Sequence, residues 1–127
     1  VLCGVLLGLR LHPRGSLSLV ERLWATVRPR LTTTTSLSAA LLTEAAQGYA
    51  VAPVVRLAEA LAGAAGGPTT EGRPSTAVME AVQAVLAIGH SSGADLLGGL
   101  AGCLDALDTI DLLDHSPRLA TTRRSLP

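Results

Sequence analysis

The clearest structural signal in the chain is the stretch SGADLLGGLAGCLDAL, which runs from Ser92 to Leu107. Its leucines recur every three or four residues, which is the spacing of one face of an α-helix. We therefore predict a helix over residues 93–113, opened by the polar residues that precede the first leucine. Gly98, Gly102 and Ala106 recur every four residues on one face of this helix, so the backbone of another element can approach there.

The chain opens on a similar apolar segment, VLCGVLLGL, from Val1 to Leu9. Aligned without gaps on the last helix, this segment matches at three pairs: Leu2 with Leu97, Gly4 with Gly99, and Leu9 with Leu104. The match indicates a weak internal repeat. We predict that the two segments pack together, because faces without side chains allow close backbone contact. The glycines of these faces are Gly4 and Gly8 in the first segment and Gly98 and Gly102 in the last.

Helix caps and breakers divide the rest of the chain. Ser18 and Glu21 have the spacing of a capping box, and Pro29 ends the helix that they open. Gly48 is a fitting residue just past the next helix, and Ser75 can cap a later one. The predicted helices lie near residues 1–9, 19–28, 37–47, 54–64, 76–88 and 93–113. In the helix near 76–88, the expected buried stripe consists of Val78, Met79, Val82, Val85 and Leu86.

The predicted fold class is all-α: a compact helical domain over residues 1–114, followed by a flexible tail over residues 115–127. The loop over residues 67–74 is rich in Gly and Pro, and we expect it to be mobile. No capping residue precedes Val1, so we expect the C-terminal part of a larger α or α+β protein. In the α+β alternative, a preceding half contributes a sheet that these helices cover.

Composition narrows the classes of partner. The 127 residues carry a formal net charge of +0 at pH 7, and Trp24 and Tyr49 are the only aromatic residues. A neutral chain with so few stacking groups is not expected to bind nucleic acid. No run of about 18 consecutive apolar residues occurs, so we expect no membrane span. Cys3 and Cys103 lack the spacing of a metal site and are interpreted as reduced, buried thiols of a cytoplasmic protein.

Acidic residues recur every three positions near the end of the last predicted helix. They are Asp105, Asp108, Asp111 and Asp114. No His or Cys joins them at the spacing of metal ligands, so we interpret them as a solvated helix face. The sequence also contains no phosphate-binding loop and no dinucleotide fingerprint. We therefore expect no metal and no cofactor.

The turn before the last helix concentrates groups that suit a ligand. His90, Ser91, Ser92, Gly93 and Asp95 place an imidazole, two hydroxyls, a flexible glycine and a carboxylate where a helix presents unpaired N–H groups. Such a helix start suits an anion. The structural alternative is that Ser92 and Asp95 only cap the helix while His90 packs locally. The functional hypothesis predicts that Ser92 is the cap and that His90, Ser91 and Asp95 open toward a shared cleft.

A second hydroxyl-rich run precedes the helix predicted over residues 37–47. Thr35 and Ser38 lie near the start of that helix and suit an anion in the same way. Ordinary capping is again the alternative, because Ser and Thr are common cap residues. We include both in the predicted substrate-binding set.

Three stretches of the chain resemble the AllH-like family. They are GHSSGADLLGGL (89–100), TTSLSAALL (34–42) with Ala45, Ala46 and Gly48, and VLCGVLLGL (1–9). In order and rough spacing, the resemblance covers about residues 1–110. Family members carry a Leu-Thr-Pro-Ser-Gly-Asp-Asp segment directly before the helix that resembles residues 1–9, and this chain lacks it.

The resemblance implies a subunit linked to carbamoyl transfer in ureide catabolism, where oxamate and carbamoyl phosphate are interconverted with oxalurate. It implies a small anionic substrate bound at residues 89–95, sister subunits, and a chain that is inactive alone. The resemblance does not tell which subunit performs the chemistry, so the catalytic residues stay open. The competing hypothesis is a non-catalytic helical scaffold whose glycine faces dock partner subunits.

Overall fold

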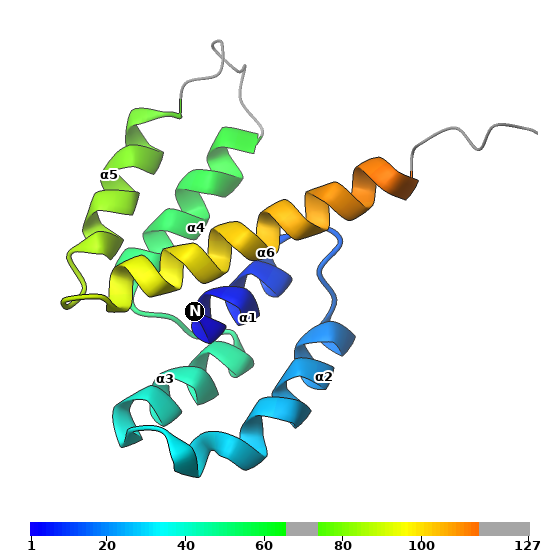
Figure 1. Cartoon of the computed structure of the whole chain (residues 1–127). Helices are drawn as coiled ribbons and strands as arrows, with labels where there is room; N and C mark the ends of the chain where they lie inside the picture. The colour runs from blue at the N-terminus through cyan, green and yellow to red at the C-terminus, as the bar shows by residue number, and fades with distance from the viewer. Residues whose placement is uncertain (66–73, 115–127) are drawn as a thin grey trace, which may run out of the picture.

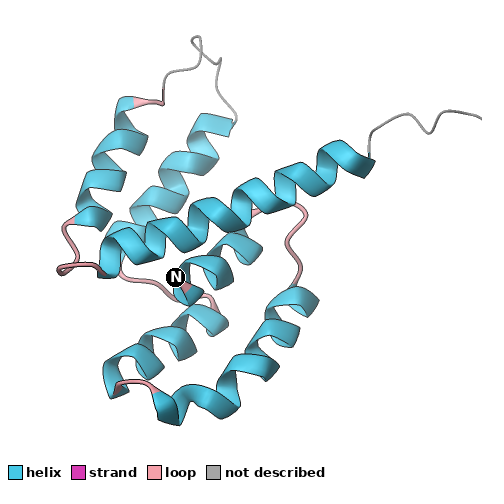
Figure 2. Ribbon diagram, viewed as in Figure 1, coloured by secondary structure: helices cyan, strands magenta, loops and turns pink. Residues whose placement is uncertain are grey.

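The computed structural model describes residues 1–65 and 74–114, and every regular element in these ranges is a helix (Figure 2). In chain order they are α1 (Leu2–Leu11), α2 (Leu17–Val27), the 3₁₀-helix η1 (Arg28–Thr33), α3 (Ser36–Gln47), α4 (Ala52–Ala65), α5 (Thr76–Leu86) and α6 (Ser92–Asp114). The all-α prediction is confirmed. The predicted tail and nearly all of the predicted mobile loop lie outside the described residues.

The helices are arranged around α1 and the long helix α6 (Figure 1). Helix α1 packs against α6, α2 and α3, while α5 contacts both α6 and its neighbour α4. One buried core joins two groups of helices, those packed around α1 and the pair α4 and α5. Its fully enclosed residues are Leu6 of α1, Leu57 of α4 and Val85 of α5. Burying such side chains is the main force that holds the helices together.

The predicted packing of the first segment on the last helix is confirmed, but through a different glycine of α6. A Cβ placed on Gly4 would overlap the carbonyl oxygen of Leu96, and a Cβ placed on Gly8 would lie 2.9 Å from the Cβ of Cys103. On the α6 side, a Cβ on Gly99 would overlap the carbonyl oxygen of Val1. The two helices therefore touch backbone to backbone.

The prediction that Gly98 and Gly102 form the contact is wrong. A Cβ at either position would meet nothing within 4 Å, and both residues are exposed. The contacting face of α6 contains Leu96, Gly99 and Cys103, which lie three and four residues apart. Glycines spaced by four do share a helix face, but the leucines around Gly99 direct its face toward α1.

The contacts follow the register of the weak sequence repeat. Gly4 and Gly99 lie 95 positions apart, and so do their partners Val1 and Leu96. Each helix thus presents its glycine to the equivalent carbonyl of the other. The contacts advance along both helices together, from Gly4 to Gly8 on α1 and from Leu96 to Cys103 on α6. The helices consequently run in the same direction, and their N-terminal ends lie on the same side of the molecule.

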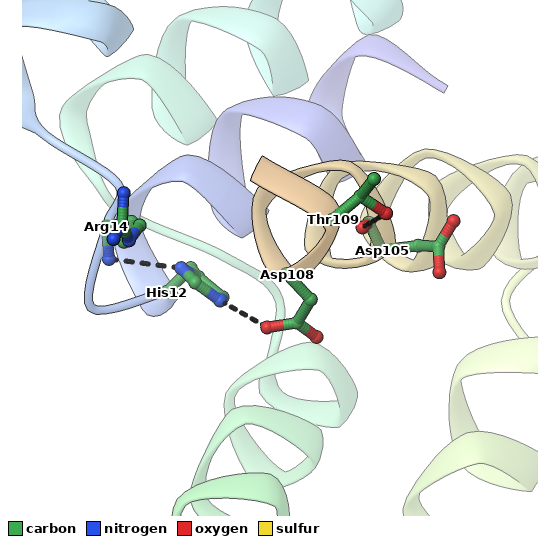
Figure 3. A network of polar contacts seen from close by, with 5 residues as sticks. All are labelled: His12, Arg14, Asp105, Asp108 and Thr109. Carbon is green, nitrogen blue, oxygen red and sulfur yellow. Dashed lines mark hydrogen bonds and ion pairs between the residues drawn. The ribbon is translucent and has the colours of Figure 1, made fainter. Parts of the chain in front are cut away.

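His12, in the connection after α1, contacts Asp108 in the C-terminal half of α6 (Figure 3). The backbone N–H of Arg14 donates to Nδ1 of His12 at 3.0 Å. A neutral ring therefore carries its proton on Nε2, which lies 2.8 Å from Oδ1 of Asp108. Asp108 belongs to the acidic series that was interpreted as a solvated face, and it remains largely exposed. An exposed contact of this kind contributes about 0–1 kcal/mol to stability.

The C-terminal end of α3 is held by a side chain of α1. The guanidinium of Arg10 donates to the carbonyl oxygen of Ala46, which is one of the carbonyls left unpaired at a helix end. Gly48 follows with φ 92°, a left-handed conformation that favours glycine. A Cβ added there would lie 3.2 Å from a terminal nitrogen of Arg10. The predicted role of Gly48 just past this helix is confirmed.

Two details of the helix predictions are wrong. Helix α2 begins earlier than expected, because Ser16 rather than Ser18 is its cap and accepts a hydrogen bond from the N–H of Leu19 at 3.2 Å. Helix α2 does end before Pro29, as predicted. The proline lies in the first turn of η1, where a missing N–H is tolerated. In α5, Val85 is buried as predicted, but Met79 and Leu86 are exposed, because the face that includes Ala81 and Val85 points inward.

Candidate functional site

The turn between α5 and α6 brings the first turn of α6 against the end of α5. Gly89 adopts φ 60°, and the N–H of Gly93 donates to the carbonyl of Ile88 at 3.1 Å. Gly93 is buried, and a Cβ on it would overlap the carbonyl oxygen of Val85. Glycine at position 93 thus permits a close approach of two backbones and fixes where α6 begins.

The predicted cap of α6 is displaced by one residue. The N–H of Asp95 donates to the carbonyl of Ser91 at 2.8 Å, which is the first bond of the helical ladder. The residue whose carbonyl accepts that first bond occupies the N-cap position, so Ser91 occupies it and Ser92 is already helical. The prediction that Ser92 is the cap of α6 is therefore wrong.

A cavity of about 600 Å³ lies beside the N-terminal ends of α1 and α6. Its walls come from these two helices, from α3, from the connection after α3, from the start of α4 and from Ile88. Leu7, Leu42 and Val54 are among its apolar lining residues. The polar lining residues are Ser38, Glu44, Tyr49, Ser92 and Asp95. A pocket with a mainly apolar wall and a few polar groups is the usual form of a small-molecule site.

The cavity brings together residues from both predicted binding segments. Ser38 reaches it from α3, and Ser92 and Asp95 reach it from the first turn of α6. Thr35 does not line it. Its hydroxyl oxygen instead accepts from the N–H of Ser38 at 3.2 Å and lies 3.0 Å from the Ser38 hydroxyl oxygen. Thr35 therefore caps α3 and supports Ser38.

The remaining residues of the predicted turn lie outside this lining. His90 and Ser91 are exposed in the turn, and Gly93 is buried against α5. None of the polar residues of the turn is sealed in the core, since His90, Ser91, Ser92 and Asp95 are all exposed.

Sequence analysis alone did not identify three residues of the cavity. Glu44 is the only charged residue of α3, and a single acidic residue near the end of a helix gives no signal of a site in the sequence. Tyr49 is one of two aromatic residues in the chain. Cys3 and Cys103 are only partly buried, so the prediction of buried thiols is wrong. Cys3 also lines the cavity, and its partial burial raises the pKa of its thiol, an effect that the nearby N-terminal amino group and a backbone hydrogen bond partly oppose.

The electrostatics of the cavity are mixed. The N-terminal ends of α1 and α6 both contribute to it through Val1, Leu2, Ser92 and Asp95, and each helix end carries about half a positive charge. Glu44 and Asp95 add two carboxylates, while no Arg, Lys or His side chain of the described residues lines the cavity. The arrangement offers a partly positive helix-end region to an anionic group and oxygen acceptors to N–H groups.

Over residues 1–65 and 74–110, no group of three or more His, Cys, Asp or Glu side chains has the arrangement of a metal site. Among the helices that the structure describes, none has the length and hydropathy required to span a membrane.

Comparison with known proteins gives one result. A family model described as oxamate carbamoyltransferase subunit AllH matches residues 1–104. No curated protein and no solved structure matches the chain. The matched range contains α1 to α5 and the part of α6 that borders the cavity. The family name is that of a carbamoyltransferase subunit, a protein of a multi-subunit complex. This match covers most of the sequence, and the chain belongs to the AllH family.

Proposed function

We propose that this chain binds the small substrate of a carbamoyltransferase complex in the cavity beside α1, α3 and α6. The observation that carries the proposal is the meeting of Ser38, Ser92 and Asp95 from two separate segments in one cavity of about 600 Å³. The substrate class suggested by the family name is oxamate, a small molecule with one carboxylate and one amide. The cavity is large enough for oxamate together with a carbamoyl group.

Each part of such a ligand has a counterpart in the lining. The N-terminal ends of α1 and α6 favour the carboxylate, because their partial charges are positive. The hydroxyls of Ser38 and Ser92 can donate to or accept from either end of the ligand. The carboxylate of Asp95 accepts only, and it suits the N–H groups of the amide. These are binding roles, and the chemical step is assigned to no residue of this chain.

The other residues of the predicted binding set have supporting roles in this proposal. Thr35 holds Ser38 through their mutual hydrogen bonds, and Gly93 lets α6 begin close to α5. His90 and Ser91 are exposed in the turn adjoining Ser92, where a sister subunit or an outer part of the ligand can contact them. We place the activity in the cytoplasm, in ureide catabolism, because both cysteines are free thiols and the family name indicates oxamate chemistry.

A non-catalytic scaffold is the second candidate function, and the exposed apolar residues of α3 favour it. Leu37 is 71% exposed and does not line the cavity, whereas Leu41, one turn later, is 41% exposed and is one of the lining residues of the cavity. Apolar side chains clustered on an exposed face are common where another protein docks. A scaffold requires no ligand in the cavity, so ligand binding separates the two candidates.

Calorimetric titration of the complex with oxamate and with carbamoyl phosphate tests the proposal. We expect binding by the unmodified protein and affinity reduced about tenfold or more by Asp95→Ala and by Ser92→Ala, since each substitution removes a hydrogen-bonding group. Asp105→Ala is the matched control, because Asp105 lies on the same helix outside the cavity. Absence of binding by the unmodified complex would reject the proposal and favour the scaffold.

A further inference from the structure

We infer that Glu44 and Asp95 make the cavity selective for a ligand with one carboxylate and one amide or carbamoyl group, against a dicarboxylate of the same size. The inference rests on the proposed function and goes beyond it, because it names the residues that determine specificity. It concerns the choice between oxamate and oxalate, two molecules that differ by an amide in place of a carboxylate.

The two acidic residues of the cavity lie at helix ends. Glu44 lies in the last turn of α3 and Asp95 in the first turn of α6, and both line the same cavity. Neither carboxylate pairs with a cationic side chain within the described residues. Their charges therefore act on whatever enters the cavity.

No Arg, Lys or His side chain of the described residues lines the cavity to offset these two carboxylates. The ends of α1 and α6 each supply about half a positive charge. Glu44 is at the opposite kind of helix end, where the dipole is negative and adds to its charge. Arg10 is also at that end, but it donates to the carbonyl of Ala46 and does not line the cavity.

Oxamate and oxalate interact differently with these charges. A ligand with one carboxylate can place it at the helix ends and direct its N–H groups toward Glu44 and Asp95, which accept hydrogen bonds. A dicarboxylate has no N–H group and brings a second negative charge toward these acceptors. Like charges brought together are unfavourable, and solvent moderates the cost here because Glu44 and Asp95 are exposed. The serine hydroxyls do not discriminate, because they donate as well as accept.

The test is calorimetric titration of the complex with oxamate and with oxalate near pH 7. We expect oxamate to bind about tenfold or more tightly than oxalate. Glu44→Gln keeps the size of the side chain and removes its charge, so we expect it to reduce this ratio at least threefold, mainly through tighter oxalate binding. Glu21→Gln is the matched control, since Glu21 is exposed on α2 and does not line the cavity.

The outcomes separate this inference from the proposed function. Equal affinity for the two ligands would overturn the selectivity while leaving the binding role intact. A ratio that Glu44→Gln leaves unchanged, in protein with an unaltered helical circular dichroism spectrum, would overturn the assignment to Glu44. Binding of neither ligand would reject the proposed function and this inference with it.

Discussion

Gly99→Ala is expected to lower the free energy of unfolding by about 1–3 kcal/mol, which is the usual cost of overpacking. The added Cβ would overlap the carbonyl oxygen of Val1, and a backbone oxygen cannot move aside without displacing α1. The same change one residue earlier should have the opposite sign. Gly98→Ala adds a Cβ that meets nothing within 4 Å, and alanine in a helix interior is favoured over glycine by about 0.5–1 kcal/mol.

Urea unfolding followed by circular dichroism measures both variants under the same conditions. The pair is internally controlled, because the two substitutions are chemically identical and lie in consecutive positions of α6. A result in which both alanines stabilise the protein would contradict the close contact between α1 and α6. The same would hold if both variants unfolded at the midpoint of the unmodified protein.

Leu6→Ala is expected to lower the free energy of unfolding by about 2–5 kcal/mol. Leu6 is 0% exposed and belongs to the core cluster that joins the helix groups, so truncation removes buried methyl groups and leaves a void. Leu37→Ala is the matched control. Leu37 is 71% exposed, and we expect its truncation to change stability by no more than about 0.5 kcal/mol. Thermal unfolding that ranked the two variants equally would contradict the position of the core.

The helices could be predicted from the sequence because their signals are local. Ser75 caps α5 through a hydrogen bond from the N–H of Val78 at 3.3 Å, and Gly48 ends α3 with a left-handed conformation, as their positions in the sequence indicate. Cap positions were less predictable where two serines compete. Ser16 was preferred over Ser18, and Ser91 over Ser92, because the backbone entering each helix selects the cap.

The contact between α1 and α6 could be predicted only in outline. Glycines in both segments indicated a close approach, but Gly98 and Gly102 share one face of α6 and Gly99 lies on another, and only the packing of neighbouring leucines selects between these faces. The gapless alignment of Gly4 with Gly99 held the better information, since it gives the register in which the helices meet. A repeat is thus more informative here than the spacing of glycines alone.

The candidate site could be predicted in part. The sequence indicated Ser38, Ser92 and Asp95 from their places near helix starts, and these residues line one cavity in the structure. It could not indicate Glu44, which is near the end of its helix and enters the cavity only because Arg10 and the α1–α3 packing place α3 beside α1. Such a residue belongs to the site through tertiary structure alone.

Cys3 offers the most direct measurement of where the substrate binds. It lines the cavity, whereas Cys103 packs against Gly8 outside it, and burial raises the pKa of both thiols. Alkylation should therefore be followed near pH 9, where enough thiolate forms, in the intact complex and with mass spectrometry of each cysteine. The proposed function predicts that saturating oxamate slows the alkylation of Cys3 severalfold and leaves the rate at Cys103 unchanged. An unchanged rate at Cys3 under saturating oxamate would contradict binding in this cavity.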